Sequence, residues 1–138
     1  MKRHVLTDGR GVPISVLTTG ANVHDKWMVG EVLDATVVRA PRGPRRPVHL
    51  CLDKGYDYAD AEAAVRHRRI TPHIRRRGEP PLLGCVHGKP RRWVVERTNS
   101  WHNRYRGLLV RWERKAENYL AMLYLTCGII AFQQAHGF

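Results

Sequence analysis

Apolar and polar positions in the first half of the chain follow first a strand pattern and then a helix pattern. Two β-prone runs flank Asp8 and Gly9, and an Asp-Gly pair between such runs is typical of a hairpin turn, so we predict a strand hairpin over residues 3–19. Apolar residues then recur at helical spacing and predict a helix over 25–38. A short, continuous apolar run bounded by proline and glycine predicts a buried strand over 48–53.

The second half of the chain continues the alternation of helix and strand and then becomes helical. We predict an amphipathic helix over 58–68, a short strand over 70–74, and a basic loop over 75–90, where arginine, glycine and proline leave little periodicity. Helices are predicted over 91–106 and 115–134. The alternation predicts an α/β fold in which helices cover the faces of a sheet, and the opening hairpin makes that sheet mixed.

The charge of the chain narrows the class of partner. With 138 residues the chain has the length of one domain, and 24 lysines and arginines against 12 acidic residues give a net charge of +12. The basic residues occur in separate clusters, which favours a folded basic surface over a disordered tail. Nucleic acid is therefore the expected class of partner.

Cysteine usage and hydropathy indicate the compartment. The three cysteines are widely spaced and form no paired motif for zinc or for a disulfide framework, which favours a reducing cytoplasm. The uncharged run 119–132 is shorter than a membrane span requires and predicts a buried helix. We therefore expect no membrane association.

Two acidic residues stand out in so basic a chain. Asp53 ends the apolar run at 48–53, where a buried strand meets solvent, and α/β proteins commonly place chemistry at such strand ends. Glu96 lies in the arginine-rich helix predicted over 91–106. Because carboxylates are ligands that Mg²⁺ prefers, the pair suggests metal-dependent chemistry on a polyanion. Alternatively, Asp53 is a turn residue and Glu96 is a surface residue that pairs with Arg92.

An ordered set of short motifs covers nearly the whole chain. The motifs are KRHVLTDGRG at 2–11, LTTGAN at 17–22, HD at 24–25, DKGYD at 53–57, IRRRG at 74–78 and RWVVERT at 92–98. The set and its spacing resemble the C-terminal part of the catalytic domain of the DDE transposases of bacterial insertion sequences. Each motif alone is weak, but their common order is specific.

The resemblance implies an RNase H-like fold, in which a mixed sheet is flanked by helices, and this chain is expected to lack the first strand. In the family that strand carries the first of three catalytic acids. Asp53 resembles the second acid and Glu96 the third, so the two are expected to be catalytic residues that bind Mg²⁺ or Mn²⁺. Asp8 is an alternative for the missing acid, but its Asp-Gly context favours a turn.

The resemblance also indicates which basic residues contact DNA. Arg92 matches the arginine four positions before the glutamate in the family signature, whereas Lys89 and Asn103 replace the tyrosine and the lysine expected there. Trp93 and Trp101 are expected in the core, because helices usually bury their aromatic residues. The expected DNA contacts come from eight arginines: Arg75, Arg76, Arg77, Arg91, Arg92, Arg97, Arg104 and Arg106.

These features imply a portion of a transposase that cuts and joins phosphodiester bonds at insertion-sequence ends. The expected partners are transposon-end and target DNA, further copies of the chain in a synaptic complex, and an upstream transposase segment or reading frame that supplies the first acid. Alone, the chain is expected to be inactive, and its expected location is the cytoplasm, in association with the nucleoid. The alternatives are a non-catalytic DNA-binding fragment that modulates transposition and a general basic nucleic-acid binder.

Overall fold

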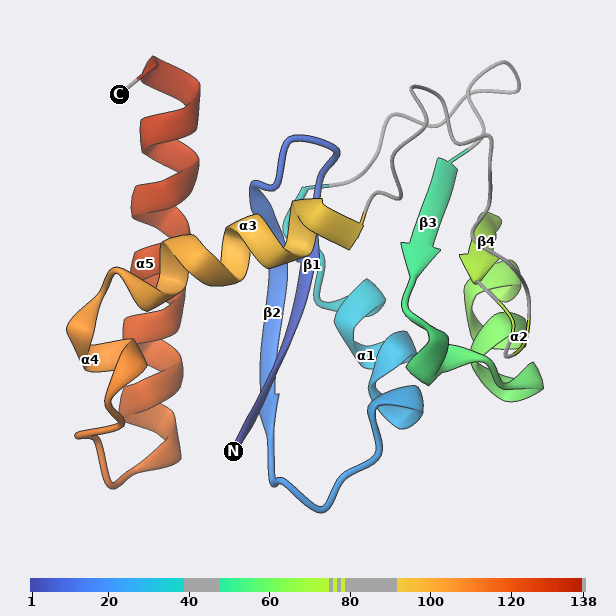
Figure 1. The fold of residues 1–138 in the computed structure, drawn as a ribbon, viewed down its shortest axis with the longest axis horizontal. Helices are drawn as coiled ribbons and strands as arrows, with labels where there is room; N and C mark the ends of the chain where they lie inside the picture. The colour runs from blue at the N-terminus through green and yellow to red at the C-terminus, as the bar shows by residue number, and fades with distance from the viewer. Residues whose placement is uncertain (39–47, 75, 77, 79–91, 138) are drawn as a thin grey trace. The chain divides into compact units, whose positions relative to one another are not determined.

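The computed structural model describes residues 1–38, 48–74, 76, 78 and 92–137. The chain forms two compact units (Figure 1). The terminal unit consists of Met1–Ala21 and Trp93–Phe138, and the middle unit consists of Asn22–Arg92. Each unit is described by itself below.

A hairpin opens the terminal unit. Strand β1 (Lys2–Thr7) pairs antiparallel with β2 (Pro13–Thr19), which confirms the predicted hairpin over 3–19. The Asp8 carboxylate accepts hydrogen bonds from the backbone N–H groups of Arg10, at 2.8 Å, and Val12, at 2.9 Å. These bonds hold the loop between the strands, so the turn interpretation of Asp8 is confirmed.

Three helices complete the terminal unit: α3 (Arg92–Asn103), α4 (Arg106–Leu109) and α5 (Ala116–His136). The predicted helix over 115–134 is confirmed as α5, whereas the predicted helix over 91–106 is too long, because α3 ends at Asn103. The chain then tightens, and Tyr105 takes an extended conformation at the start of α4. The Tyr105 side chain packs against the core of the unit, so tertiary packing overrides the helical pattern at this point.

Helix α5 lies beside β2 (Figure 1) and buries one stripe of side chains. Tyr119 and Leu123 of this stripe form the core with Val16 and Leu108. The opposite side of α5 is exposed, so the uncharged run 119–132 is buried along one face only. Within residues 1–38, 48–74 and 92–137, no helix has the length and apolar character needed to cross a membrane.

The middle unit is built on a strand–helix–strand arrangement. Strand β3 (Val48–Leu52) and strand β4 (Ile70–Ile74) are parallel, and α2 (Ala59–His67) connects them. The predictions for 58–68 and 70–74 are confirmed to within one residue, and the strand predicted over 48–53 ends one residue early. Val29 of α1 (Val29–Asp34) packs with Ala61 and Val65 of α2 in the core of the unit.

The helix predicted over 25–38 is shorter than expected. It begins with a 3-10 turn, Asp25–Met28, and continues as α1 only to Asp34. Three consecutive β-branched residues, at 36–38, lower the helix propensity of the segment that follows. The Asp34 carboxylate accepts two hydrogen bonds from the Arg68 guanidinium, at 2.6 and 2.8 Å, which holds the end of α1 against α2.

The described strands form two sheets of two strands each, an antiparallel sheet in the terminal unit and a parallel sheet in the middle unit. The mixture of helices with strands confirms the predicted α/β class. A single mixed sheet of RNase H type stays a prediction, and so does the absence of its first strand. The basic loop predicted over 75–90 lies outside the described residues, except for Arg76 and Gly78.

The terminal unit contains a buried histidine. His102 of α3 has no exposed surface, and its Nε2 lies 3.4 Å from Sγ of Cys127 on α5. Burial lowers the pKa of His102 to about 4, and the positive charge of Arg3 adds to the shift. The neutral imidazole is therefore the form that the fold accommodates.

We predict that the free energy of unfolding falls as the pH is lowered from about 6.5 to about 4. In this window the unfolded chain binds a proton at His102 and the folded chain does not, which costs the fold about 3 kcal/mol. Urea unfolding at several pH values measures this dependence. The variant His102→Asn should show a shallower slope over the window, whereas exposed His136→Ala should keep the native slope. An unchanged slope in His102→Asn would contradict the assignment.

Candidate functional site

Asp53 follows the last residue of β3, at the carboxyl end of the parallel strand. Its backbone is extended, and its Oδ1 accepts a hydrogen bond from the backbone N–H of Lys54 at 2.7 Å, so it caps the short 3-10 turn Lys54–Tyr56. The side chain is exposed. The turn thereby fixes a carboxylate at the solvent end of a strand.

The pKa of Tyr56 is affected by burial and by the charges near this strand end. Burial raises the pKa of Tyr56 to about 12, and the nearby negative charges of Asp25 and Asp53 add to the shift. Asp25 belongs to the HD motif at 24–25, and its spacing along the chain contains no signal that brings it near Tyr56. The carboxylates of Asp25 and Asp53 therefore both lie near Tyr56 at the end of β3.

Glu96 lies on α3, and the residues next to it anchor that helix. Thr98 has no exposed surface, and its hydroxyl donates a hydrogen bond to the carbonyl oxygen of Gly11 at 2.5 Å. Arg97 donates a hydrogen bond to the carbonyl oxygen of Arg10. Both carbonyls belong to the hairpin loop, so α3 is held there by two successive side chains. Glu96 itself is exposed.

Arg97 is held between two tryptophans of the same helix. Its guanidinium carbon lies 4.6 Å from the ring centre of Trp93 and 5.1 Å from that of Trp101, within the range of cation–π attraction. Trp93 is 44% exposed, so the expectation that it belongs to the core is wrong. It stacks on Arg97 instead of entering the core. These interactions already engage the guanidinium of Arg97. The DNA contact expected of Arg97 stays a prediction.

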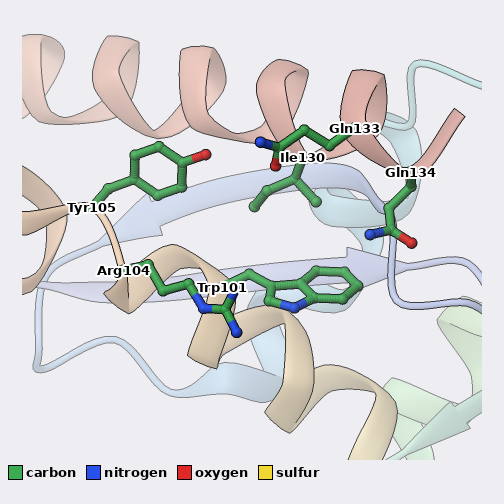
Figure 2. Close-up of a pocket in the computed structure, with 6 residues that line it drawn as sticks. All are labelled: Trp101, Arg104, Tyr105, Ile130, Gln133 and Gln134. Carbon is green, nitrogen blue, oxygen red and sulfur yellow. The ribbon is translucent and has the colours of Figure 1, made fainter. Parts of the chain in front are cut away.

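The remaining predicted arginines are placed differently. Arg104 is exposed and lines a pocket of about 200 Å³ together with Trp101, Tyr105 and three side chains of α5 (Figure 2). Arg106 is exposed and lies 5.9 Å from the ring centre of Trp112. Arg76 lies 3.7 Å from the Glu62 carboxylate. The predictions for Arg75, Arg77 and Arg91, and for the side chain of Arg92, lie outside the described residues.

The two predicted catalytic acids belong to different units, Asp53 to the middle unit and Glu96 to the terminal unit. Their convergence on one metal site stays a prediction. Both side chains are exposed carboxylates, so they fit a hard divalent cation as donors. Among the residues that the structure describes, no three acidic, histidine or cysteine side chains are grouped to hold a metal ion. The donor type therefore fits, but the described donors are fewer than a two-metal site requires.

Comparison with known families shows which family the chain belongs to. Residues 1–130 match the family model described as "Transposase DDE domain". The chain belongs to this transposase family. The resemblance of the motifs to this family is thereby confirmed, and the catalytic roles of Asp53 and Glu96 stay predictions.

The chain is also similar to a protein of Burkholderia cepacia that is named as a transposase for insertion sequence element IS402. The two sequences are 39% identical over 134 residues, which cover 95% of this chain and 62% of the relative. The chain thus spans less than two thirds of the length of that relative. Among solved structures, none matches the chain.

Gly11 provides a test of the anchoring of α3. We predict that Gly11→Ala lowers the free energy of unfolding by about 1–3 kcal/mol, because φ at this residue is +89° and alanine is strained there. An added Cβ would also lie 3.2 Å from the Thr98 hydroxyl and 3.4 Å from the Arg97 guanidinium. Urea unfolding measures the change.

Gly9 is the matched control in the same loop, because a Cβ there would meet no atom within 4 Å. Gly9→Ala should therefore leave stability nearly unchanged. Equal effects of the two substitutions would contradict the account of how α3 is anchored.

The arginines of the terminal unit differ in how far other protein groups already bind their guanidinium groups. Their contributions to DNA binding should therefore differ too. We predict that Arg104→Gln and Arg106→Gln each reduce the salt dependence of DNA binding by about one unit of slope, because each exposed charge can release one counterion. Arg97→Gln should mainly lower stability. Fluorescence anisotropy of a labelled duplex across a sodium chloride series measures the slope.

The control for this series is Arg66→Gln, because Arg66 is neutralised by Glu62 at 2.7 Å. Its slope should equal that of the unsubstituted chain. If the salt dependence of DNA binding were unchanged in both Arg104→Gln and Arg106→Gln, these residues would not belong to the DNA interface.

Proposed function

We propose that this chain acts in DNA transposition, as part of a transposase that cuts and joins phosphodiester bonds at the ends of an insertion sequence. The observation that carries the proposal is the exposed carboxylate of Asp53 at the carboxyl end of a parallel strand, within a chain that belongs to the DDE transposase family. Strand ends of this kind are where α/β proteins commonly place their functional groups.

Asp53 and Glu96 would hold divalent cations, Mg²⁺ or Mn²⁺, through their carboxylate oxygens. Cations bound there would activate the attacking water or 3′-hydroxyl and stabilise the leaving oxygen. Glu96 lies on a helix whose rotation is fixed by the Thr98 and Arg97 contacts, so its Cα–Cβ bond has a defined direction.

We further propose that a third carboxylate comes from a transposase segment outside these 138 residues. A two-metal site needs several converging acids, and Asp53 and Glu96 supply two. The carboxylate of Asp8 does not supply the third, because it is hydrogen-bonded inside the hairpin loop. On this proposal the chain alone does not cleave DNA. In the active synaptic complex it joins that segment, further copies of itself, and the transposon-end and target DNA, in the nucleoid.

The charge of the chain also supports a second candidate, a DNA-binding fragment that modulates transposition without catalysis. The net charge of +12 and the exposed Arg104 and Arg106 favour binding to the phosphate backbone, and neither requires the acids. The two candidates differ in one respect: a binding fragment keeps its effect when Asp53 and Glu96 are replaced.

The test is cleavage of a supercoiled plasmid that carries the DNA flanking the gene. The protein assayed is the chain fused to its upstream transposase segment. We predict Mg²⁺-dependent nicking that falls by more than about 100-fold in Asp53→Asn and in Glu96→Gln, because loss of a metal ligand costs more than loss of a group that merely supports one. DNA binding, measured in parallel, should be retained by both variants.

Glu31→Gln is the control, because Glu31 is an exposed acid on α1 that the proposal does not assign to the metal site. It should nick at the native rate. Nicking that survives replacement of both Asp53 and Glu96 would remove the catalytic assignment, and modulation of transposition by that doubly substituted protein would favour the binding fragment. Robust nicking by the 138-residue chain alone would overturn the need for a further segment.

A further inference from the structure

The parallel sheet of the middle unit has one apolar and one polar face. Alternate residues of β3 and β4 are half-buried towards the core, and the residues between them are exposed on the other face. The exposed residues are His49, Cys51, Thr71 and His73, which carry two imidazoles, one thiol and one hydroxyl. This face plays no part in the site proposed above.

The two histidines point their ring nitrogens at each other. Nδ1 of His49 lies 2.8 Å from Nε2 of His73, and the ring planes are tilted by 34°. In the register of the sheet His49 is opposite Thr71, so the two histidines are diagonal neighbours across adjacent strands. At this distance one ring donates an N–H and the other accepts with a lone pair, so at least one imidazole is neutral.

We propose that His49 and His73 form a binding site for a transition-metal ion of the Ni²⁺ or Cu²⁺ type. Metal–nitrogen bonds of about 2.0–2.1 Å at a right angle place two ligand nitrogens about 2.9 Å apart, whereas a tetrahedral angle places them about 3.3 Å apart. The observed 2.8 Å is a hydrogen-bond distance between the two rings, and it is nearer to the right-angle separation, which is typical of tetragonal Ni²⁺ and Cu²⁺ sites.

Binding requires little rearrangement of the chain. The accepting ring already presents a lone pair, and the donating ring does so after a change of tautomer, with its proton carried on the nitrogen that faces away. Both side chains are exposed, so the rings can rotate until the two lone pairs meet at the ion. The described residues offer no third acidic, histidine or cysteine ligand in the same group.

The ligand class separates this site from the carboxylate site. Imidazole nitrogens suit Ni²⁺, Cu²⁺ and Zn²⁺, while Mg²⁺ prefers carboxylates and water. An ion held by His49 and His73 links β3 to β4 four residues before Asp53. Binding should therefore stabilise the parallel strand pair. The proposal of this metal site does not depend on the proposed function.

Isothermal titration of the full chain with Ni²⁺ tests the proposal. Nickel is the better probe because Cu²⁺ oxidises thiols, and Cys51 is exposed on the same face. The unsubstituted chain should bind one ion at this site and should melt at a higher temperature when nickel is present. His49→Ala and His73→Ala should each weaken binding at least about tenfold, because even a group that only supports a ligand is worth about 10-fold to 100-fold.

Three variants serve as controls. His67→Ala removes an exposed histidine on α2, and Thr71→Val and Cys51→Ser alter the same face without removing an imidazole, so all three should keep the native affinity. Melting temperatures without nickel confirm that each variant folds. Native affinity in the double variant His49→Ala/His73→Ala would overturn the proposal, and so would loss of binding in Cys51→Ser with both histidines intact.

Discussion

The hydrogen bond from the Thr98 hydroxyl to the carbonyl oxygen of Gly11 is the contact on which the terminal unit depends. It joins α3 to a hairpin loop that lies 87 positions earlier in the chain, and its donor is fully buried. The same hydroxyl also lies 3.1 Å from the Val94 carbonyl oxygen of its own helix, so the buried group is satisfied. Together with the bond from Arg97 to the Arg10 carbonyl oxygen, the bond to Gly11 fixes where α3 meets the hairpin loop. Gly11 has a positive φ, and its lack of a Cβ leaves room for the Thr98 and Arg97 side chains to reach the loop.

The exposure of the candidate acids follows from such constraints. Because Thr98 and Val94 are buried on one side of α3, Glu96 must face solvent from the other side. Asp53 is presented in a different way, by a turn that begins where β3 ends. Each unit thus fixes one carboxylate with local contacts of its own. The proposed chemistry requires the two units to bring these carboxylates together around the metal ions.

Short-range patterns predicted the elements of this fold better than their ends. The strand 70–74 and the hairpin at Asp8 were predicted because strand periodicity and turn chemistry are local properties of the sequence. The end of α3 at Asn103 was not predicted, because it depends on the packing of Tyr105 against residues elsewhere in the unit. For the same reason the sequence could not separate Arg97, which is engaged by two tryptophans and the hairpin loop, from the more exposed arginines of the same segment.

The central claim is that Asp53 and Glu96 bind the same metal site, and paramagnetic broadening by Mn²⁺ tests it most directly. In a titration of the isotope-labelled chain followed by nuclear magnetic resonance, backbone signals next to Asp53 and next to Glu96 should broaden together, with one saturation curve. Asp53→Asn should then abolish the broadening near Glu96, and Glu96→Gln the broadening near Asp53. Broadening at one acid that persists when the other is replaced would contradict a shared site.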